Sequence, residues 1–280
     1  MGIGRSVICR GRPVCLPKIK MEMQPKIKFS DVTKLFVNNA GKEEIVLGDL
    51  NFEIYAEEFV CILGPSGCGK STILGLVAGF IKPTSGEILF NSKLVKRPDS
   101  SRTLVFQEYA LFPWLNILDN VAFGLTTKNH NGKKTREKAL EYLNLVGLSA
   151  YKDHSISQLS GGMKQRVAIA RALAVDPEVL LLDEPFGALD QQSRENMQTE
   201  LVRLWTKTKK TVIFVTHSVD EALKLADRIL VIGGKPGELL FDATVAVSRP
   251  RNFKDSELVK IRSHILDKLA TPDLFMGSDI

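Results

Sequence analysis

The sequence lacks any apolar run long enough to cross a membrane. A membrane-spanning helix needs about 18 or more consecutive apolar residues, and no stretch of this chain approaches that length. The basic segment at residues 1–25 also lacks the apolar stretch of a secretory signal peptide. We therefore expect a chain that neither spans a membrane nor is exported.

Cysteine is scarce: the chain has only Cys9, Cys15, Cys61 and Cys68. Their spacing fits neither a zinc site nor a disulfide framework. Cys68 also lies inside a glycine-rich loop, which favours a reducing compartment. The cysteines therefore predict a cytoplasmic protein.

The surplus of positive charge is modest and unevenly placed. The net charge is +6 over 280 residues. Residues 1–25 hold five basic residues and one acidic residue, so most of the surplus belongs to this segment, which we predict to be a flexible tail. A nucleic-acid-binding domain carries its basic patch on the folded surface, so we expect no nucleic-acid partner.

A glycine-rich stretch fits the pattern G-x-x-x-x-G-K-[ST] at every fixed position. Before it, Phe59–Leu63 is a short apolar run typical of a buried strand. After it, apolar residues from Ile73 to Ile81, Phe80 among them, recur at helical spacing. The candidate phosphate-binding residues are Gly64, Pro65, Ser66, Gly67, Cys68, Gly69, Lys70, Ser71 and Thr72.

A strand, a glycine loop and a helix N-terminus together make an anion site. The glycines allow backbone N–H groups to turn towards phosphate, and the start of the helix adds partial positive charge. Lys70 supplies a full charge for the β- and γ-phosphates, and Ser71 offers a hydroxyl to Mg²⁺. This P-loop, Gly64–Ser71, predicts a nucleoside triphosphate site.

The rest of the chain alternates apolar strands with helical patterns. Alternating residues between Ile27 and Ile54 predict half-buried antiparallel strands, with a turn at residues 38–41. Further strands are expected at residues 87–90, 103–106, 179–182, 211–215 and 229–232, most of them separated by helices. This alternation predicts an α/β fold with a mainly parallel sheet covered on both faces.

Two segments depart from the alternation. Residues 108–165 have the pattern of an inserted α-helical subdomain, with an exposed loop at Thr126–Thr135 and a helix at Arg136–Val146. A C-terminal helix is predicted by the spacing of Leu258, Ile261, Ile265 and Leu269. We therefore predict one domain over residues 26–250 and a helical extension over residues 251–280.

Polar residues follow three of the predicted strands. Asp183 and Glu184 come directly after one strand, and Gln107 and His217 end two others. The carboxyl ends of parallel strands meet at the edge where ligands bind. We expect Asp183, with Ser71 and Gln107, to hold Mg²⁺. We expect Glu184, His217 and Gln107 to position the attacking water.

A second phosphate cradle follows further along the chain. Ser160, Gly161 and Gly162 open a predicted helix, so their backbone N–H groups can bind an anion. Because the chain has only one P-loop, this cradle is best explained if it faces the P-loop of another copy. A two-fold head-to-tail homodimer would then contain two composite sites.

These motifs, in this order, resemble those of the ATP-binding subunits of ABC transporters over about residues 26–250. The resemblance implies a P-loop NTPase that hydrolyses ATP with Mg²⁺, with Glu184 as the catalytic glutamate and His217 as the switch histidine. It places Asp190 in the D-loop and Phe36 where an aromatic stacks on adenine, although Phe36 could equally be a core residue. Met163 departs from the family, which usually has glutamine after Ser-Gly-Gly.

Finer features look most like the nitrate, sulfonate and taurine group of bacterial importers. They are the stretches Val105–Trp114, Asp119–Gly124, Leu159–Arg166 and Ser248–Arg251, while Asp183–Asp190 has the form seen in bacterial importers. Importers of thiamine-precursor pyrimidines carry similar subunits, so the substrate stays open. The resemblance implies a peripheral protein on the cytoplasmic face of the inner membrane. Its partners would be transmembrane permease subunits and, indirectly, a substrate-binding protein. We expect the permease to contact the aromatic-rich residues 107–124.

Two other classes of function fit the sequence less well. Gln107 falls where the ABC family has its Q-loop glutamine. A soluble ABC ATPase acting on DNA inserts a coiled coil or zinc module after this glutamine, and the 53 positions from Gln107 to Ser160 leave too little room for either. Ribosome-acting members usually carry two cassettes in one chain, and this chain has one. A P-loop module that binds without turnover would not need Glu184 and His217.

Overall fold

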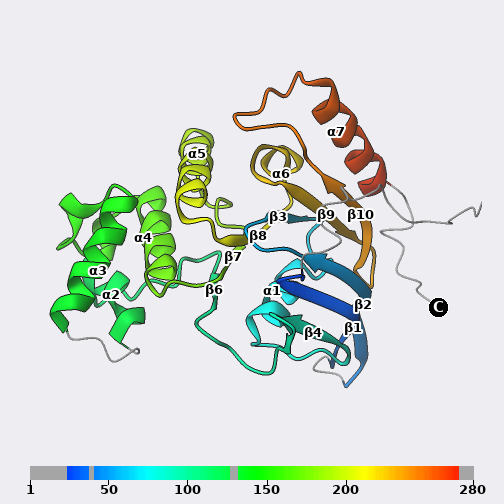
Figure 1. Cartoon of the computed structure of the whole chain (residues 1–280), viewed down its shortest axis with the longest axis horizontal. Helices are drawn as coiled ribbons and strands as arrows, with labels where there is room; N and C mark the ends of the chain where they lie inside the picture. Colours follow the sequence, from blue (N-terminus) through cyan, green and yellow to red (C-terminus); the bar gives the residue numbers. More distant parts are fainter. Residues whose placement is uncertain (1–23, 38–40, 127–131, 271–280) are drawn as a thin grey trace, which may run out of the picture.

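The structure is a computed structural model that describes residues 24–37, 41–126 and 132–270. These residues form a six-stranded sheet, a four-stranded sheet and seven α-helices. Figure 1 shows both sheets in the middle and right of the view and a group of helices at the left. Nearly all of the predicted tail at 1–25, and three of the four residues of the predicted turn at 38–41, lie outside the described residues.

The six-stranded sheet has the strand order β10-β9-β3-β8-β7-β6. Every neighbouring pair is parallel except β9 and β10, which are antiparallel. The mainly parallel sheet is therefore confirmed, while β10 is a strand that the sequence pattern did not predict. The strands are β3 (Phe59–Leu63), β6 (Arg102–Val105), β7 (Val179–Asp183), β8 (Thr211–Thr216), β9 (Arg228–Gly233) and β10 (Glu238–Thr244).

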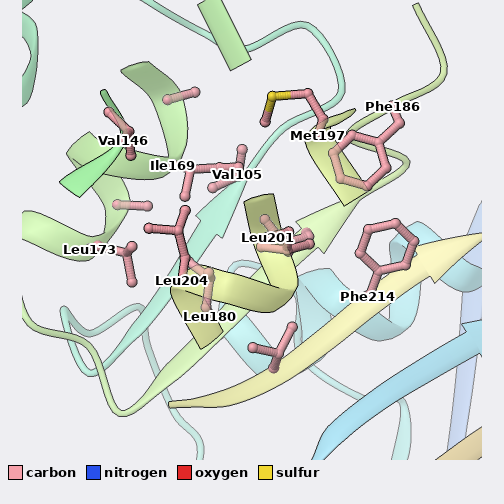
Figure 2. Packing of buried hydrophobic residues seen from close by; sticks show 14 of the residues in the cluster. Val105, Val146, Ile169, Leu173, Leu180, Phe186, Met197, Leu201, Leu204 and Phe214 are labelled. Carbon is pink, nitrogen blue, oxygen red and sulfur yellow. The ribbon is translucent and has the colours of Figure 1, made fainter. Parts of the chain in front are cut away.

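Both faces of this sheet are buried, which explains its uninterrupted apolar strands. In β8, Val212 and Phe214 belong to one hydrophobic core, and Ile213 and Val215 belong to the other. Figure 2 shows the first core, where Phe214 and Leu180 of the sheet pack with residues of two long helices. These helices are α4 (Gly161–Ala174) and α5 (Gln191–Thr208).

The four-stranded sheet is antiparallel and has the order β2-β1-β4-β5. Its strands are β1 (Ile27–Val37), β2 (Glu43–Ile54), β4 (Ser85–Phe90) and β5 (Lys93–Leu94). The antiparallel pairing predicted between Ile27 and Ile54 is confirmed, and these two residues are register partners. The second hydrophobic core joins this sheet to helix α1 (Lys70–Ala78) and to the six-stranded sheet.

Helix α1 ends earlier than its apolar spacing suggested. Gly79, at φ 83°, adopts the left-handed conformation that ends many helices. The N–H groups of Phe80 and Ile81 then turn back to the carbonyl of Gly75. The prediction that Phe80 lies on the buried face of this helix is wrong, because its side chain is 59% exposed beyond the helix end.

A group of helices is inserted between β6 and β7, as predicted. It contains α2 (Ile117–Thr126), α3 (Gly132–Leu145), α4 and 3-10 turns at Ser149–Tyr151 and Ile156–Gln158. Helix α3 begins four residues before the predicted Arg136, and Thr135, expected in an exposed loop, is buried. The domain limits at 26–250 and 108–165 stay predictions.

Helices α6 (Val219–Leu225) and α7 (Ser256–Leu269) complete the described fold. Leu258 and Ile265 of α7 enter the first core, as the apolar spacing predicted. Among the described residues, no helix is both long and apolar enough to cross a membrane.

Candidate nucleotide-binding site

The P-loop connects the buried strand β3 to helix α1 at the carboxyl edge of the six-stranded sheet. Gly67 and Gly69 adopt φ of 84° and 91°, a region that side chains other than glycine rarely enter. A Cβ at Gly64 would lie 2.2 Å from the carbonyl oxygen of Ile232, so β9 packs directly against the loop. Ser66 and Gly67 are exposed at its tip. The loop is therefore fixed from behind and open in front, as phosphate binding requires.

Lys70 is held across this loop. Its Nζ donates to the carbonyl oxygens of Gly64 at 2.9 Å and Pro65 at 2.7 Å. The nearest carboxylate is Glu184, whose Oε1 lies 3.9 Å away. Only 5% of the Lys70 side chain is exposed. A buried ammonium with this loose a carboxylate partner leaves positive charge for an anion in the loop.

Ser71 and Asp183 meet beside the P-loop, as the sequence predicted. The Ser71 Oγ donates to the Asp183 Oδ1 at 3.1 Å. Burial raises the pKa of the Asp183 carboxyl, the adjacent Glu184 raises it further, and the Ser71 hydrogen bond and Lys70 oppose the shift. A hydroxyl and a carboxylate are oxygen ligands of the kind that Mg²⁺ prefers.

No cluster of three or more histidine, cysteine or acidic residues suited to a metal occurs in the described parts of the chain. Mg²⁺ commonly takes one or two protein oxygens and completes its shell with water and substrate phosphates. Ser71 and Asp183 therefore fit a metal ion that arrives with a nucleotide, not one held by the protein alone.

Glu184 and His217 form a pair at the same edge. The Glu184 Oε2 lies 3.0 Å from the Nδ1 of His217, while its Oε1 faces Lys70. Glu184 has a positive φ of 41°, and its N–H donates to the carbonyl of Val215 in β8. Such a backbone conformation is costly for a residue with a side chain, and it occurs most often at functional sites.

Gln107 lies two residues beyond the end of β6. Its side chain is exposed and forms no hydrogen bond within the described residues. Its amide nitrogen lies 3.7 Å from the position that a Cβ of Gly187 would occupy, three residues beyond Glu184. The structure thus places Gln107 near the Glu184–Gly187 turn, and its predicted role towards metal and water stays a prediction.

Ser160, Gly161 and Gly162 begin helix α4, as predicted. The Ser160 Oγ accepts a hydrogen bond from the N–H of Met163, so Ser160 caps the helix. A Cβ at Gly162 would meet no atom within 4 Å. Among the described residues, no hydrogen bond joins this cradle to the P-loop.

Asp190 and Phe36 lie outside the cluster around Lys70. Asp190 caps helix α5, with its Oδ1 accepting from the N–H of Ser193 at 3.0 Å. Phe36 is 40% exposed near the end of β1, so the alternative of a core residue is wrong. The Lys34 Nζ lies 4.8 Å from the centre of its ring. Their predicted roles towards nucleotide are not tested by this geometry.

The sequence reasoning missed a segment that supports the P-loop from the side. A Cβ at Gly237 would lie 2.1 Å from the carbonyl oxygen of Cys68. Gly237 also donates to the carbonyl of Val46 in β2. The glycines and proline between Gly233 and Gly237 mark a turn and were the available signal.

The Cys68 thiol is not a reactive group. The residue is 2% exposed, and burial raises the pKa of its thiol. Since the thiolate is the reactive form, Cys68 acts here as a packing residue of the loop.

Comparison with known proteins shows the family of the chain. Residues 47–187 match the ABC transporter family. An uncharacterized ABC transporter ATP-binding protein of Methanocaldococcus jannaschii is 45% identical over 90% of this chain and 94% of its own length. A taurine import ATP-binding protein of Pelagibacter ubique is 46% identical over 75% and 79%. An aliphatic sulfonates import ATP-binding protein of Bacillus thuringiensis is 40% identical over 90% and 99%.

A solved structure of an ATP-binding cassette has a similar fold. It is a dimeric ATP-binding cassette in a post-hydrolysis state, bound to ADP and Pi. It is 35% identical to this chain with a TM-score of 0.70, covering 79% of this chain and all of the other. The chain therefore belongs to the ABC transporter family, as an ATP-binding subunit with ATPase activity coupled to transport.

Proposed function

We propose that this chain is the ATP-hydrolysing subunit of an importer for taurine, another sulfonate or a related small anion such as nitrate. The observation that carries the proposal is the convergence of Lys70, Ser71, Asp183, Glu184 and His217 at one sheet edge. The relatives named for taurine and aliphatic sulfonate import support the substrate class.

Each residue of this cluster has a distinct task in ATP hydrolysis. Lys70 offsets the charge of the β- and γ-phosphates, which the backbone N–H groups of the P-loop also bind. Ser71 and Asp183 would hold Mg²⁺, which supplies further neutralisation of the phosphates. The exposed ring of Phe36 is available to stack on the adenine.

Glu184 is the group that acts on the attacking water. One of its oxygens pairs with His217, so the carboxylate is fixed in orientation. A carboxylate held in this way can accept a hydrogen bond from the water and align it with the γ-phosphate. His217 positions Glu184, and its side chain is 59% exposed, so it can also reach a phosphate.

The site is completed by a second copy of the chain. The cradle Ser160–Gly162 is open and uses its one side-chain hydrogen bond to cap its own helix. A two-fold dimer would bring this cradle to the partner's P-loop and enclose two nucleotides. The dimeric solved relative supports this arrangement.

The permease is expected to dock on a groove between β6 and helices α2 and α4. Apolar residues including Phe106, Phe123 and Val175 line this groove, which encloses about 350 Å³. Arg171 fixes its floor by donating to the carbonyls of Tyr109 and Ala110. Trp114, which is 76% exposed, lies in the aromatic-rich segment of residues 107–124 that we expect the permease to contact. A groove of this size and polarity suits one amphipathic helix of a membrane partner, which would place the subunit at the cytoplasmic face of the membrane.

The catalytic part of the proposal is tested by Glu184→Gln. The amide keeps the shape of the site but is a much poorer proton acceptor, so hydrolysis should fall by about 10²-fold or more. Binding of a fluorescent ATP analogue should persist. The matched control is Glu141→Gln on the exposed surface of α3. A Glu184→Gln protein that hydrolyses ATP at the wild-type rate would refute the assigned role.

The transport part is tested with the assembled complex. The chain should co-purify with permease subunits encoded beside it, and Phe123→Asp should break that association while leaving ATP binding intact. Uptake into vesicles should depend on ATP and discriminate taurine and alkyl sulfonates from pyrimidines. Purification as a stable soluble protein with no permease, together with wild-type uptake in cells lacking it, would contradict the proposal.

A further inference from the structure

A second cavity shares no lining residue with the permease groove. It is formed by helices α5 and α6 and by residues 249–253, which lead into α7 in the orange part of Figure 1. Its volume is about 380 Å³, at the lower end of the range for sites that bind small molecules. Neither ATP hydrolysis nor permease docking, as described above, uses it.

The charges that line this cavity are all positive. They belong to Lys224 of α6 and to Arg249 and Arg251, and no carboxylate is among the lining residues. Lys224 is half-buried, and within the described residues its amine forms no hydrogen bond or ion pair. A half-buried ammonium without a partner marks a place where an anion would be favoured.

The two arginines leave part of this charge uncompensated. Arg249 pairs with Asp227 at 2.8 Å. Arg251 donates only to backbone carbonyls, those of Leu223, Val245 and Val247. Burial, and then repulsion from Arg249, lower the pKa of Arg251 to about 10. The region is therefore short of negative charge.

Nearby carboxylates do not make up the deficit. Asp220 and Glu221 line an adjoining hollow, which Lys224 also borders. Asp220 pairs with Arg262 at 3.1 Å, and Glu221 lies 4.0 Å from Arg194. Asp220 and Glu221 thus each have an arginine beside them, and Glu195, which also lines this hollow, accepts a hydrogen bond from the side-chain amide of Gln191.

The remaining wall of the cavity is largely apolar. Val202, Trp205 and Phe253 contribute to it. The indole N–H of Trp205 is occupied by the carbonyl of Lys210, and the hydroxyls of Thr199 and Thr206 donate to carbonyls of their own helix. Arg249 lies over the Trp205 ring, 4.7 Å from its centre, so a ligand would meet cations and carbon surface side by side.

The cavity is linked to the pair of Glu184 and His217 by two hydrogen bonds and one peptide bond. Gln198, which lines the cavity, donates to the Glu221 Oε1 at 3.1 Å. The Glu221 Oε2 accepts from the Thr216 hydroxyl at 2.6 Å. Thr216 directly precedes His217, the partner of Glu184.

We propose that this cavity is an effector site for a small organic anion, a single acidic group on an apolar body, and that its occupation lowers ATP turnover. The head group binds Lys224 and competes for the amide of Gln198. Glu221 then loses a contact that holds it against Thr216, and the position of His217 becomes less defined. The inhibitory part rests on the proposed roles of His217 and Glu184, whereas binding does not.

Binding can be measured without nucleotide, because Trp205 lies in the wall of the cavity. The chain has only one other tryptophan, Trp114, so Trp114→Phe leaves Trp205 as the sole indole reporter. Benzenesulfonate should change its fluorescence in a saturable way. Inorganic sulfate, which lacks the apolar body, and phenol, which lacks the charge, should each bind at least about tenfold more weakly.

The variants locate the site. Lys224→Gln in the Trp114→Phe background should weaken benzenesulfonate binding by about tenfold, the loss of one charge-assisted hydrogen bond. Lys224→Arg should retain binding. Lys207→Gln removes an equivalent charge from the exposed surface of α5, outside the cavity, and should change nothing.

The effector role is then read from ATPase activity with Trp114 restored. Saturating benzenesulfonate should lower the turnover of wild type and of Lys207→Gln by at least about twofold, and should leave Lys224→Gln unaffected. No saturable signal from Trp205, or equal binding by Lys224→Gln, overturns the site. Binding that depends on Lys224 but leaves ATP turnover unchanged overturns the effector role.

Discussion

Asp183 and Glu184 place two adjacent carboxyl groups beside one buried lysine. The fold keeps both because each faces a different partner: Asp183 faces Ser71, and Glu184 faces His217. The cost appears at Asp183, whose pKa is raised first by burial and then by the charge of Glu184. A site that must bind a cation and polarise water carries such excess negative charge in its protein part.

This cost predicts a stability change for Asp183→Asn. A carboxyl whose pKa is raised by folding contributes stability below its unfolded pKa, and this contribution is lost as the pH rises through the folded pKa. At pH 7 the asparagine, which can still accept from Ser71, should therefore raise the melting temperature of the nucleotide-free protein. The gain should shrink towards pH 4 and below, and ATP hydrolysis should be lost.

The control for this change is Asp153→Asn, an exposed carboxyl between the 3-10 turns. It should leave both the melting temperature and its pH dependence as in wild type. A lower melting temperature for Asp183→Asn across the whole pH range would contradict the account, since it would mean that the ionised carboxylate stabilises the fold.

Most residues of the Lys70 cluster could be predicted because each ends a strand or follows the P-loop. Strand ends of a parallel sheet converge by topology, so Ser71, Asp183 and His217 needed no three-dimensional information. The positions of residues that lie in loops were harder to predict from the sequence. Gln107 lies one residue beyond Phe106 and is exposed, and the support that Gly237 gives to the P-loop depends on a turn with no apolar pattern.

At the scale of elements, helix α4 carries the open cradle at its first turn. Its N–H groups and its helix dipole favour negative charge there. Within one copy, Ser160 caps the turn and Gly162 has free space around it. A substitution at Gly162 should therefore affect the stability of the monomer and the activity of the proposed dimer in different ways.

The variant Gly162→Asp distinguishes the effect on monomer stability from the effect on ATPase activity. In the monomer, aspartate in the first turn should stabilise the helix by about 0.3–1 kcal/mol, so the melting temperature should hold or rise. In the closed dimer the same charge would face the γ-phosphate bound to the partner, and ATPase activity should be nearly abolished.

Gly132→Asp, at the open start of α3, is the matched control and should keep full activity. Wild-type turnover by Gly162→Asp would argue that no phosphate approaches this cradle.

Strand β10 fixes the far edge of the same sheet through a buried arginine. Arg228 of β9 is 4% exposed, and its Nε donates to the Asp242 Oδ1 of β10 at 2.7 Å. It also donates to the carbonyl of Glu53 and lies 3.8 Å from Glu58. This arginine therefore ties the edge of the six-stranded sheet to β2 of the other sheet.

Asp242→Asn should destabilise the fold, because the charge of Arg228 would lose its bidentate partner while staying buried. The expected loss in the free energy of unfolding is about 3 kcal/mol, measured by urea titration. Glu200→Gln removes the partner of the exposed Arg203 on α5 and should cost less than about 1 kcal/mol. Equal losses for the two variants would show that Asp242 is not a structural ion pair.

The sequence pattern could not reveal β10. Its residues from Glu238 to Thr244 are mostly half-buried and do not alternate cleanly, because the strand lies at an edge. Its stability comes from Arg228 and from pairing with β9, neither of which leaves a local signal. The predicted start of helix α3 was four residues too late for a similar reason. The first residues of the helix are polar, and Thr135 is buried only by the tertiary fold.

At the scale of the whole molecule, the proposed function assigns two different halves of a nucleotide site to one copy. The P-loop half lies at the sheet edge with α1, and the cradle half begins α4 in the inserted helical group (Figure 1). No hydrogen bond in the described parts of the chain connects the two halves. The alternating pattern predicts the α/β fold. It does not predict the dimer, which we infer because Ser160–Gly162 has no nucleotide to bind within its own copy.

The most direct test is the mass of Glu184→Gln in solution, measured by light scattering with and without Mg²⁺ and ATP. Slow hydrolysis should trap the closed state, so the account predicts the mass of one chain without nucleotide and of two chains with it. Adding Ser160→Arg to the same protein should keep it at one chain while ATP still binds. A Glu184→Gln protein that stays at one chain under full ATP occupancy, or a dimer indifferent to Ser160→Arg, would contradict the composite site.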